Sequence, residues 1–445
     1  MPTFPFDFVF GVATSAFQIE GAWDADGKGA SIWDTFGHMP GNVDGDVPGD
    51  VACDHYHRYP EDIALMRGMG CDSYRFSFSW PRILPEGVGQ ANPLGLDFYD
   101  RLVDAMLEAG IVPNATLYHW DLPQALQDRG GWPHPDSPQW FAEYAGLVAS
   151  RFGDRIPLWS TLNEPISLWV GYGMGVFAPG IADPVLGRQA MHNGLVAHGL
   201  GVMQLREAAP EADIGLVLDI WKRHPSSDSD ADQAIADRDE DTSFRFFLDG
   251  ALRGGYGARV VDTLEREGTM PVVRDGDFAT MSQGLDYLGL NVYGRVVVDA
   301  QHYNPEWWVT AGQHPSGNYL QNGMEFYPKS VYDAIMLVRD EYADDLPLFI
   351  TENGVADGDG LSADECLNDA ERIDYIRGFL TWIARAMDHG ADVRGYYAWS
   401  LIDNYEWAAA FTKKFGLVHV DPDTLERTPK ASARWYAKVI EARGF

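Results

Sequence analysis

The chain has 445 residues, of which 33 are Lys or Arg and 66 are Asp or Glu, so its formal net charge is −33. A chain of this length with 46% hydrophobic residues can bury a large core, and its composition is that of a folded protein. The acid excess leaves no basic surface for nucleic-acid phosphates or for an anionic membrane, and we expect neither as a partner.

The cysteines and the N-terminus bear on the compartment. Cys53, Cys71 and Cys366 show no CxxC spacing, which predicts neither a disulfide framework nor a zinc site and indicates a reducing cytoplasm. Residues 1–7 lack the basic and apolar regions of a signal peptide. No stretch approaches the roughly 20 apolar residues of a membrane span. The sequence therefore predicts a cytoplasmic protein.

Short β-rich runs alternate with amphipathic helical stretches along the whole chain. The runs predicted as strands are 8–17, 73–80, 112–119, 158–163, 213–220, 287–293, 346–351 and 393–400. Helical patterns between them cover 54–69, 95–109, 138–152, 187–208, 331–342 and 369–389. No linker interrupts the alternation, which predicts an α/β protein whose residues 1–445 form a single (β/α)8 TIM-barrel domain with extended βα loops around the active site.

An open, doubly wound sheet is the competing arrangement. Such a sheet requires a glycine-rich phosphate turn that opens a helix after an early strand. The nearest candidate is Gly-Tyr-Gly-Met-Gly at 171–175, which lacks the last glycine at the required offset. We therefore interpret residues 171–175 as a loop and favour the barrel.

Polar residues gather at the ends of the predicted strands. In a barrel of this type the carboxyl ends of the strands converge on one pocket. The residues at or just after these ends are Gln18, Glu20, Arg75, His119, Trp120, Asp121, Asn163, Glu164, Asn291, Tyr293, Thr351, Glu352, Asn353, Trp399, Glu406 and Trp407. Buried polar groups are unfavourable unless they have partners, so their convergence indicates a ligand-binding pocket.

The residue types in this pocket favour sugar chemistry. The chain has no HExxH, Walker loop, GxSxG elbow or Cys/His metal spacing, and we expect neither a metal nor another cofactor. Tryptophan faces stack on sugar rings, and amides and carboxylates hydrogen-bond their hydroxyls. Two carboxylates that flank an acetal oxygen are the minimal apparatus for glycoside hydrolysis. Glu164 and Glu352, each followed by a turn signal, are the predicted pair.

Four motifs in order along the chain resemble the signatures of glycoside hydrolase family 1, the retaining β-glucosidase-type enzymes. They are Phe-Gly-Val-Ala-Thr-Ser-Ala-Phe-Gln-Ile-Glu-Gly at 10–21, Thr-Leu-Asn-Glu-Pro at 161–165, Ile-Thr-Glu-Asn-Gly at 350–354 and Trp-Ser-Leu-Ile-Asp-Asn-Tyr-Glu-Trp at 399–407. The resemblance extends over essentially the whole chain. It implies a small oligosaccharide, such as cellobiose, or an aryl or alkyl β-glycoside as the substrate.

The resemblance also implies roles for individual residues. Glu352 would be the nucleophile and Glu164 the acid/base, while Arg75 and Tyr293 would contact the nucleophile carboxylate. The residues implied or expected to bind the sugar are Gln18, His119, Trp120, Asn163, Asn291, Trp399, Glu406 and Trp407, with Trp399 as the platform beneath the ring.

Elementary electrostatics agrees with these roles. Arg75, held near Glu352, would keep that carboxylate ionised for attack. The charge of Glu352 would in turn favour the protonated form of Glu164. Once the nucleophile is esterified that charge is gone, and Glu164 should become acidic enough to activate water. A retaining mechanism places the two carboxyl groups about 5–5.5 Å apart.

The chain departs from the family pattern at four positions. Ile166, Phe177, Val292 and Met324 stand where the family often has other residues, and we expect them to surround the leaving group and to alter its selection. Trp221, after the fifth predicted strand, is either a contact to the leaving group or a packing residue.

The leading hypothesis is a retaining exo-β-glycosidase that acts on β-D-glucosyl residues and also on β-galactosyl or β-fucosyl residues. One alternative is a catalytically silent sugar-binding barrel, and another is a transglycosylase that uses the same residues. The sequence is compatible with a homo-oligomer.

The charge leads to a prediction about salt. Few acidic residues belong to the motifs, so most must coat the surface, including the acidic stretch 228–241, while lysine occurs only seven times. Salt screens the repulsion among such charges, which suggests adaptation to high ionic strength. We expect thermal stability and aryl glycosidase activity to be higher in about 1 M salt than in dilute buffer. Unchanged values would contradict this prediction.

Overall fold

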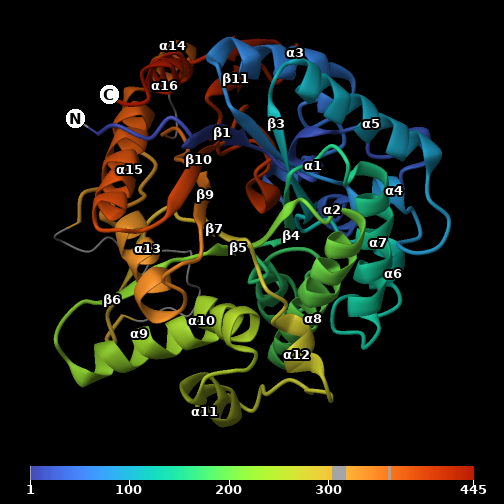
Figure 1. Ribbon diagram of the computed structural model, residues 1–445, viewed down its shortest axis with the longest axis vertical. Coiled ribbons are helices and arrows are strands. Elements are labelled where there is room, and N and C mark those ends of the chain that lie inside the picture. Colours follow the sequence, from blue (N-terminus) through green and yellow to red (C-terminus); the bar gives the residue numbers. More distant parts are fainter. Residues whose placement is uncertain (1, 303–316, 359–361) are drawn as a thin grey trace.

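Eight parallel strands close into a barrel in the computed structural model, which describes residues 2–302, 317–358 and 362–445 (Figure 1). The strands are β1 (Val9–Ala13), β2 (Ser73–Ser77), β3 (Val112–Tyr118), β4 (Leu158–Asn163), β5 (Asp213–Asp219), β7 (Tyr287–Asn291), β9 (Leu348–Asn353) and β10 (Val393–Trp399). Their order is β1-β10-β9-β7-β5-β4-β3-β2, and β1 pairs in parallel with both β10 and β2. The predicted TIM barrel is confirmed.

Helices surround the barrel (Figure 1). The long ones are α3 (His55–Met69), α5 (Pro93–Glu108), α7 (Ser137–Phe152), α8 (Pro184–Ala208), α13 (Lys329–Glu341), α15 (Ala370–Asp388) and α16 (Ala431–Ala442). A helical insertion between β5 and β7 comprises α9 (Asp230–Thr242), α10 (Phe244–Leu248), α11 (Ala258–Glu267) and α12 (Asp277–Met281). Short helices in the loops are α1 (Ala16–Ile19), α2 (Ile32–Gly37), α4 (Trp80–Ile83), α6 (Gln124–Gln127) and α14 (Ala363–Asn368).

Helix α5 illustrates how the sequence builds this outer layer. The Asn92 side chain accepts a 3.2 Å hydrogen bond from the backbone N–H of Leu94, and Pro93 occupies the first turn, where its missing N–H is not needed. The apolar residues Phe98, Leu102 and Met106 recur every four positions and are buried against the barrel. The helix therefore covers the sheet with one face and presents the other to solvent.

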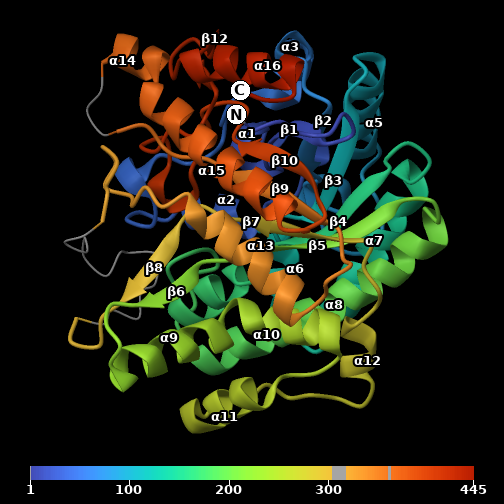
Figure 2. The ribbon, with the colours of Figure 1, turned by 60° about the vertical axis from the view of Figure 1, so that its left-hand side comes forward.

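Two small sheets were not predicted. Strands β6 (Lys222–Pro225) and β8 (Arg295–Val298) pair in parallel beside α9 and outside the barrel (Figure 2). Strands β11 (Val418–Val420) and β12 (Arg427–Pro429) form an antiparallel pair. Each strand has only three or four residues, too few for a periodic pattern to stand out.

One local prediction was wrong, and another was only partly right. Residues 171–175 do not form a loop, because Trp169–Met174 make a wide helical turn that Gly175 ends at a φ of +72°. The acidic stretch 228–241 is mostly helix α9, and Asp232, Glu240 and Asp241 within it are buried. Burial is tolerated because each has partners: the Asp232 carboxylate accepts hydrogen bonds from two serine hydroxyls, and the other two carboxylates pair with arginines.

The alternation of side chains along each strand produces two cores, one outside and one inside the barrel, and determines which residues face the site. Ile214, Leu216 and Leu218 of β5 pack outward against the helices, in the main core. Tyr287, Phe349, Tyr397 and Trp399 form a smaller cluster inside the barrel. Because side chains alternate along a strand, a residue two positions from an inward one also faces the interior. This parity directs Asp219 of β5, Asn291 of β7 and Trp399 of β10 into the barrel mouth.

Glycines make room for the aromatic rings inside the barrel. A Cβ atom on Gly11 of β1 would lie 2.4 Å from the Tyr397 ring, and one on Gly215 of β5 would lie 2.5 Å from the Tyr287 ring. Either contact is well inside van der Waals distance, so a larger residue at these inward positions would displace an aromatic ring from the floor below the site.

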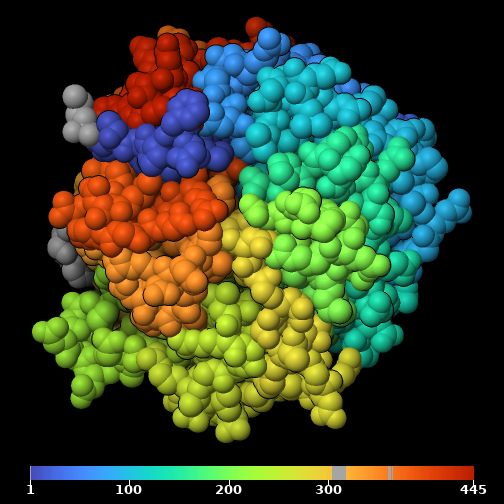
Figure 3. Space-filling view, in the orientation of Figure 1, coloured from blue at the N-terminus to red at the C-terminus, as the bar shows by residue number. Residues whose placement is uncertain are grey.

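The two ends of the chain meet beside the barrel. Thr3 bridges to Gly444, and the backbone N–H of Phe4 donates a 2.9 Å hydrogen bond to the carbonyl of Arg443. In Figure 3 the blue N-terminal residues accordingly lie beside the red C-terminal ones. Within the described ranges, no helix is both long and apolar enough to cross a membrane.

A buried charge network holds the segment that follows β10. The ammonium group of Lys430 is fully buried and lies 2.8 Å from both Asp403 and Asp357, while Arg372 pairs with Asp357. Burial alone would raise the pKa of Asp403, but Lys430 and His419 hold it below its ordinary value. The network thereby fixes the start of the segment that carries the motif residues 403–407.

Lys430→Met should destabilise the protein, because it leaves two buried carboxylates without their shared cation. Breaking a buried ion pair on one side lowers the free energy of unfolding by about 3–5 kcal/mol. Chemical denaturation monitored by tryptophan fluorescence would measure it. Lys438→Met, an exposed substitution in helix α16, which begins directly after Lys430, is the matched control and should have little effect. Equal stability of the two variants would contradict this account.

Candidate active site

A cavity of about 440 Å³ opens at the carboxyl ends of the barrel strands. Its walls include most of the predicted site residues: His119, Trp120, Asn163, Glu164, Tyr293, Glu352, Trp399, Glu406 and Trp407. Gln18, Arg75 and Asn291 lie behind this wall, fully buried, and hydrogen-bond residues that form it. The structure therefore brings all of the predicted catalytic and sugar-binding residues to one place. Glu20, Asp121 and Asn353, which were also predicted at strand ends, are buried and do not line the cavity.

The carboxylate of Glu352, at the end of β9, is held on both oxygens. Arg75 Nη1 donates to Oε1 at 2.6 Å, and the Tyr293 hydroxyl donates to Oε2 at 2.8 Å. Burial raises the pKa of Glu352, and the contacts with Arg75 and Tyr293 offset part of that rise. A carboxylate with its oxygens fixed in this way faces the cavity in one orientation.

Glu164 follows the last residue of β4 and has different surroundings. Asn291 Nδ2 donates to its Oε1 at 2.6 Å, and the Thr351 hydroxyl orients Asn291 through a 2.7 Å hydrogen bond. Burial raises the pKa of Glu164 well above its ordinary range, and the charges of Asp219 and then of Glu352 raise it further. These surroundings favour the protonated form of Glu164.

Asn163 links the two carboxylates. Its Oδ1 accepts hydrogen bonds from Arg75 Nη2 at 2.6 Å and from Asn291 Nδ2 at 3.1 Å. Its Nδ2 lies 3.0 Å from Nε2 of His119. Burial and the nearby charge of Arg75 lower the pKa of His119 far below its usual value, so the imidazole is neutral. A neutral imidazole suits hydrogen bonding to a hydroxyl.

The opposite wall of the cavity carries a second amide and carboxylate pair. Gln18 Nε2 donates to Glu406 Oε2 at 3.2 Å, and Ser15 donates to Gln18 Oε1 at 2.6 Å. Burial and then the charge of Glu352 raise the pKa of Glu406 to about 8, although the hydrogen bond from Gln18 opposes this. The pair offers both donors and acceptors to hydroxyl groups at neutral pH.

Aromatic rings line the cavity between these polar walls. The His119 ring stacks on Trp399 and on Trp407, with 5.9 Å between the ring centroids in each case. Trp120 lies 4.4 Å from Trp407. Flat aromatic surfaces next to hydrogen-bonding groups are the surroundings that a sugar ring, with its apolar faces and polar edge, requires.

Three residues of the cavity have a left-handed backbone. Glu164, Trp120 and Trp407 have φ angles of +44°, +77° and +51°, in the left-handed region that side chains larger than glycine rarely adopt. Each such residue costs on the order of 1–3 kcal/mol and persists only where the surroundings enforce it. All three residues line the cavity, so the fold is strained where it positions these side chains.

The sequence interpretation missed Asp219. This residue ends β5 and lines the cavity with Glu164 and Glu352. Burial raises its pKa to about 7, while Arg223 opposes the shift. The sequence did contain a signal for it. Strand β5 reads Asp-Ile-Gly-Leu-Val-Leu-Asp, so Asp219 is an acidic residue at the carboxyl end of an apolar run.

Three of the four departures from the family pattern line the cavity. They are Ile166, Phe177 and Met324, whereas Val292 is fully buried behind it. Trp221 also lines the cavity and stacks on Tyr293 with 6.3 Å between the ring centroids. The position of Trp221 agrees with the first of its two proposed roles, since it faces the open space next to Tyr293.

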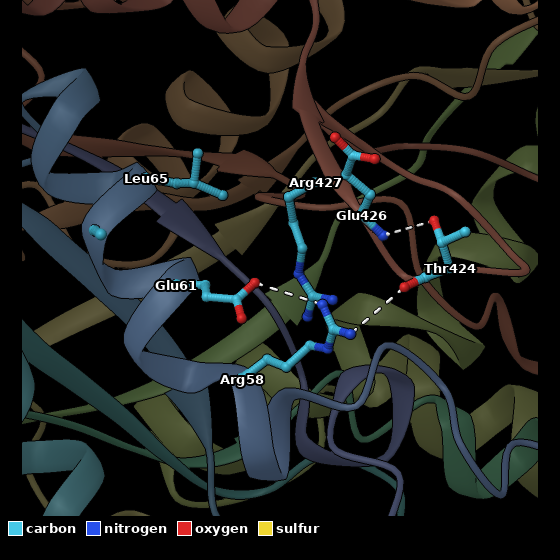
Figure 4. Close-up of a pocket in the computed structure, with 7 residues that line it drawn as sticks. Arg58, Glu61, Leu65, Thr424, Glu426 and Arg427 are labelled. Atoms are coloured by element: carbon cyan, nitrogen blue, oxygen red, sulfur yellow. Dashed lines mark hydrogen bonds and ion pairs between the residues drawn. The ribbon is translucent and has the colours of Figure 1, made fainter.

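A second hollow, of about 510 Å³, lies between α3 and the segment before β12 (Figure 4). Arg58 points across it, donates to the carbonyl of Thr424 at 3.4 Å and lies 3.5 Å from Glu61. Arg427 pairs with the buried Asp62 at 3.0 Å. The two arginines of this hollow thus pair with Glu61 and Asp62.

Comparison with known proteins agrees over the full length. The profile of glycosyl hydrolase family 1 matches residues 1–445. Beta-glucosidase A of Acetivibrio thermocellus is 43% identical over 451 residues, covering 100% of this chain and 99% of the relative. Beta-glucosidase A of Thermotoga maritima is 41% identical, covering 99% and 98% of the two chains. The structure of the Thermotoga maritima beta-glucosidase in complex with glucoimidazole superposes with a TM-score of 0.93 at 40% identity, with 100% of both chains covered.

The raised pKa of Glu406 predicts a stability change with pH. A carboxyl that binds its proton more tightly in the folded state destabilises the protein as the pH rises from about 4.5, its ordinary pKa, to about 8, its folded value. Glu406→Gln removes that titration. It should raise the unfolding free energy by on the order of 1–3 kcal/mol above about pH 8 and leave it unchanged near pH 4.

Thermal unfolding followed from about pH 4 to pH 9 would measure this difference. Glu441→Gln, at an exposed position near the end of α16, is the matched control and should track the wild type at every pH. Parallel curves for Glu406→Gln and the wild type would contradict the account of Glu406.

Proposed function

The chain belongs to glycosyl hydrolase family 1 and is an enzyme of the β-glucosidase type, and from this membership we propose that it releases terminal, non-reducing β-D-glucosyl residues with retention of configuration. Cellobiose, other small oligosaccharides and aryl or alkyl β-glucosides are the proposed substrates. The observation that carries the proposal is the asymmetry between two carboxyl groups on one cavity: Arg75 and Tyr293 hold Glu352, whereas burial and the charges of Asp219 and Glu352 raise the pKa of Glu164.

In the first step Glu352 attacks the anomeric carbon. The contacts from Arg75 and Tyr293 point its oxygens and stabilise the ionised form that attacks. Glu164 donates its proton to the glycosidic oxygen, so that the leaving group departs as a neutral alcohol. The products of this step are the free alcohol and a glycosyl ester on Glu352.

In the second step water replaces the alcohol. Glu164, now a carboxylate, takes a proton from the water, whose oxygen forms a bond to the anomeric carbon as the ester bond breaks. Two inversions restore the β configuration. The Arg75 and Tyr293 donors receive the charge that returns to the Glu352 carboxylate.

Binding of the sugar involves the remaining residues. We propose that Gln18, Glu406, His119 and Asn163 hydrogen-bond the hydroxyls, and that Trp399 lies beneath the ring. Trp120, Asn291 and Trp407 are the other proposed sugar-binding residues. Asn291 acts indirectly, through its hydrogen bond to Glu164. Gln18 and Glu406 form one hydrogen-bonded unit. We expect it to accept β-galactosides, which invert one hydroxyl, and β-fucosides, which also lack the 6-hydroxyl, but both should react more slowly than β-glucosides because their contacts are fewer or less well placed.

We propose that the leaving group contacts apolar residues rather than the polar ones that bind the sugar. Ile166, Phe177, Met324 and Trp221 line the same cavity, and we propose that these apolar side chains select aryl and other hydrophobic aglycones. The cytoplasmic location, the single-domain organisation of residues 1–445 and the oligomeric state stay predictions.

A panel of p-nitrophenyl β-D-glycosides tests the activity itself. The wild type should hydrolyse the glucoside fastest and release glucose and p-nitrophenol in equal amounts. Binding of cellobiose without any turnover would favour a silent sugar-binding protein. Release of p-nitrophenol in excess over glucose would favour transglycosylation.

Glu352→Gly should lower hydrolysis on the order of 10⁴-fold or more, because no other group can form the ester. Azide is small enough to enter the space that the carboxylate leaves, and it should restore turnover by forming the α-glucosyl azide. Thin-layer chromatography and proton NMR of the product would measure the rescue and its configuration.

Glu164→Gly is the matched control for that experiment. With a dinitrophenyl glucoside, whose leaving group needs no proton, this variant should still form the ester and give the β-glucosyl azide. The opposite pairing, a β-azide from Glu352→Gly, would assign the nucleophile to Glu164 and contradict the proposal.

A further inference from the structure

Asp219 stands between the two strands that position Glu164. In the barrel, Val217 of β5 pairs with Asn163 of β4, and the backbone N–H of Glu164 donates a 2.9 Å hydrogen bond to the Val217 carbonyl. On its other side β5 pairs Asp219 with Asn291, whose amide contacts Glu164 at 2.6 Å. Asp219 faces inward, two residues after Val217, and lines the same cavity as Glu164.

Several other charged or titratable groups face this pair from neighbouring elements. They are Arg75 on β2, His119 after β3, Arg223 on β6, Tyr293 after β7, Glu352 on β9 and Glu406 after β10. Arg75 is committed to Glu352 through its 2.6 Å contact, and His119 is neutral. Arg223 acts on Asp219 and lowers its pKa, which favours the ionised form.

We propose that Asp219 is a positioning residue whose carboxylate, in its ionised form, favours the protonated form of Glu164 in both steps of the reaction. This inference rests on the proposed function, because it concerns the acid/base role of Glu164. It differs from the simpler scheme in which Glu352 alone controls that proton. Among the charges that act on Glu164, that of Asp219 has the larger effect and that of Glu352 the smaller.

The consequence for the first step appears at alkaline pH. Burial raises the pKa of Asp219 to about 7, so this carboxyl is largely ionised on the alkaline side of that value. A neighbouring negative charge opposes the loss of the proton from Glu164. Asp219 therefore extends the pH range in which the leaving group can be protonated.

The consequence for the second step has the opposite sign. Esterification removes the charge of Glu352 but leaves that of Asp219, so the pKa of Glu164 falls to a higher value than it would reach with two carboxyl groups alone. Glu164 must be ionised to activate water, so Asp219 shifts this step to higher pH. The same charge thus favours proton donation and delays proton acceptance.

Asp219→Asn tests the inference, since it removes the charge and keeps the shape. With p-nitrophenyl β-D-glucoside, the alkaline limb of kcat/KM should move down by about one pH unit or more. With 2,4-dinitrophenyl β-D-glucoside, where the second step limits kcat, the acidic limb should also move down. If Asp219 served only in packing, its substitution would change the rates without moving both pH limbs in the same direction.

Asp213→Asn is the matched control, because it makes the same substitution at the exposed start of the same strand. Its pH limbs should coincide with those of the wild type. Asp219→Glu retains the charge and should keep the alkaline limb near that of the wild type. If Asp219→Asn does not fold, Asp219→Ser, which is smaller and uncharged, takes its place in the same comparison.

The outcomes separate this inference from the function on which it rests. Turnover by the wild type with unmoved limbs in Asp219→Asn would overturn the role of Asp219 and leave the proposed function intact. An upward shift of the alkaline limb would overturn it as well. Failure of the wild type to hydrolyse either glucoside would overturn both.

Discussion

The buried guanidinium of Arg75 is the interaction on which the rest of the site depends. One of its amino groups contacts Glu352 and the other contacts Asn163, each at 2.6 Å. Through Asn163 and Asn291 the hydrogen bonds continue to Glu164. A single cation on strand β2 therefore sets the orientation of one carboxylate directly and of the other through two amides. It also offsets part of the repulsion that arises when several carboxyl groups share one cavity.

The remaining structure supports this crowded arrangement from outside. Inward-facing glycines admit the aromatic floor below the site, and the buried Lys430 network fixes the segment that leads to Glu406 and Trp407. The left-handed backbone of Glu164 and Trp407 and the raised pKa values of Glu164 and Glu406 all oppose folding locally. The large core between barrel and helices supplies the stability that tolerates them.

Much of this could be predicted from the sequence. Strand β4 was predicted with the bounds it has, and the other barrel strands within a few residues, because long buried runs alternate regularly with helices. The site residues lie at strand ends, where topology alone brings them together. Asp219 was missed although it occupies such an end, because its effect depends on the register of β5 with β4 and β7. The short strands β6 and β8 and the buried acids of α9 depend on tertiary partners that no local pattern reveals.

The central claim is that Glu352 becomes covalently attached to the sugar. Incubation with 2,4-dinitrophenyl 2-deoxy-2-fluoro-β-D-glucoside, whose fluorine slows the second step more than the first, followed by peptide mass spectrometry, tests it most directly. We expect one sugar per chain, on the peptide that contains Glu352, and recovery of the unlabelled protein when an acceptor sugar is added. A label on Glu164, or no label while the parent glucoside is hydrolysed, would contradict the account.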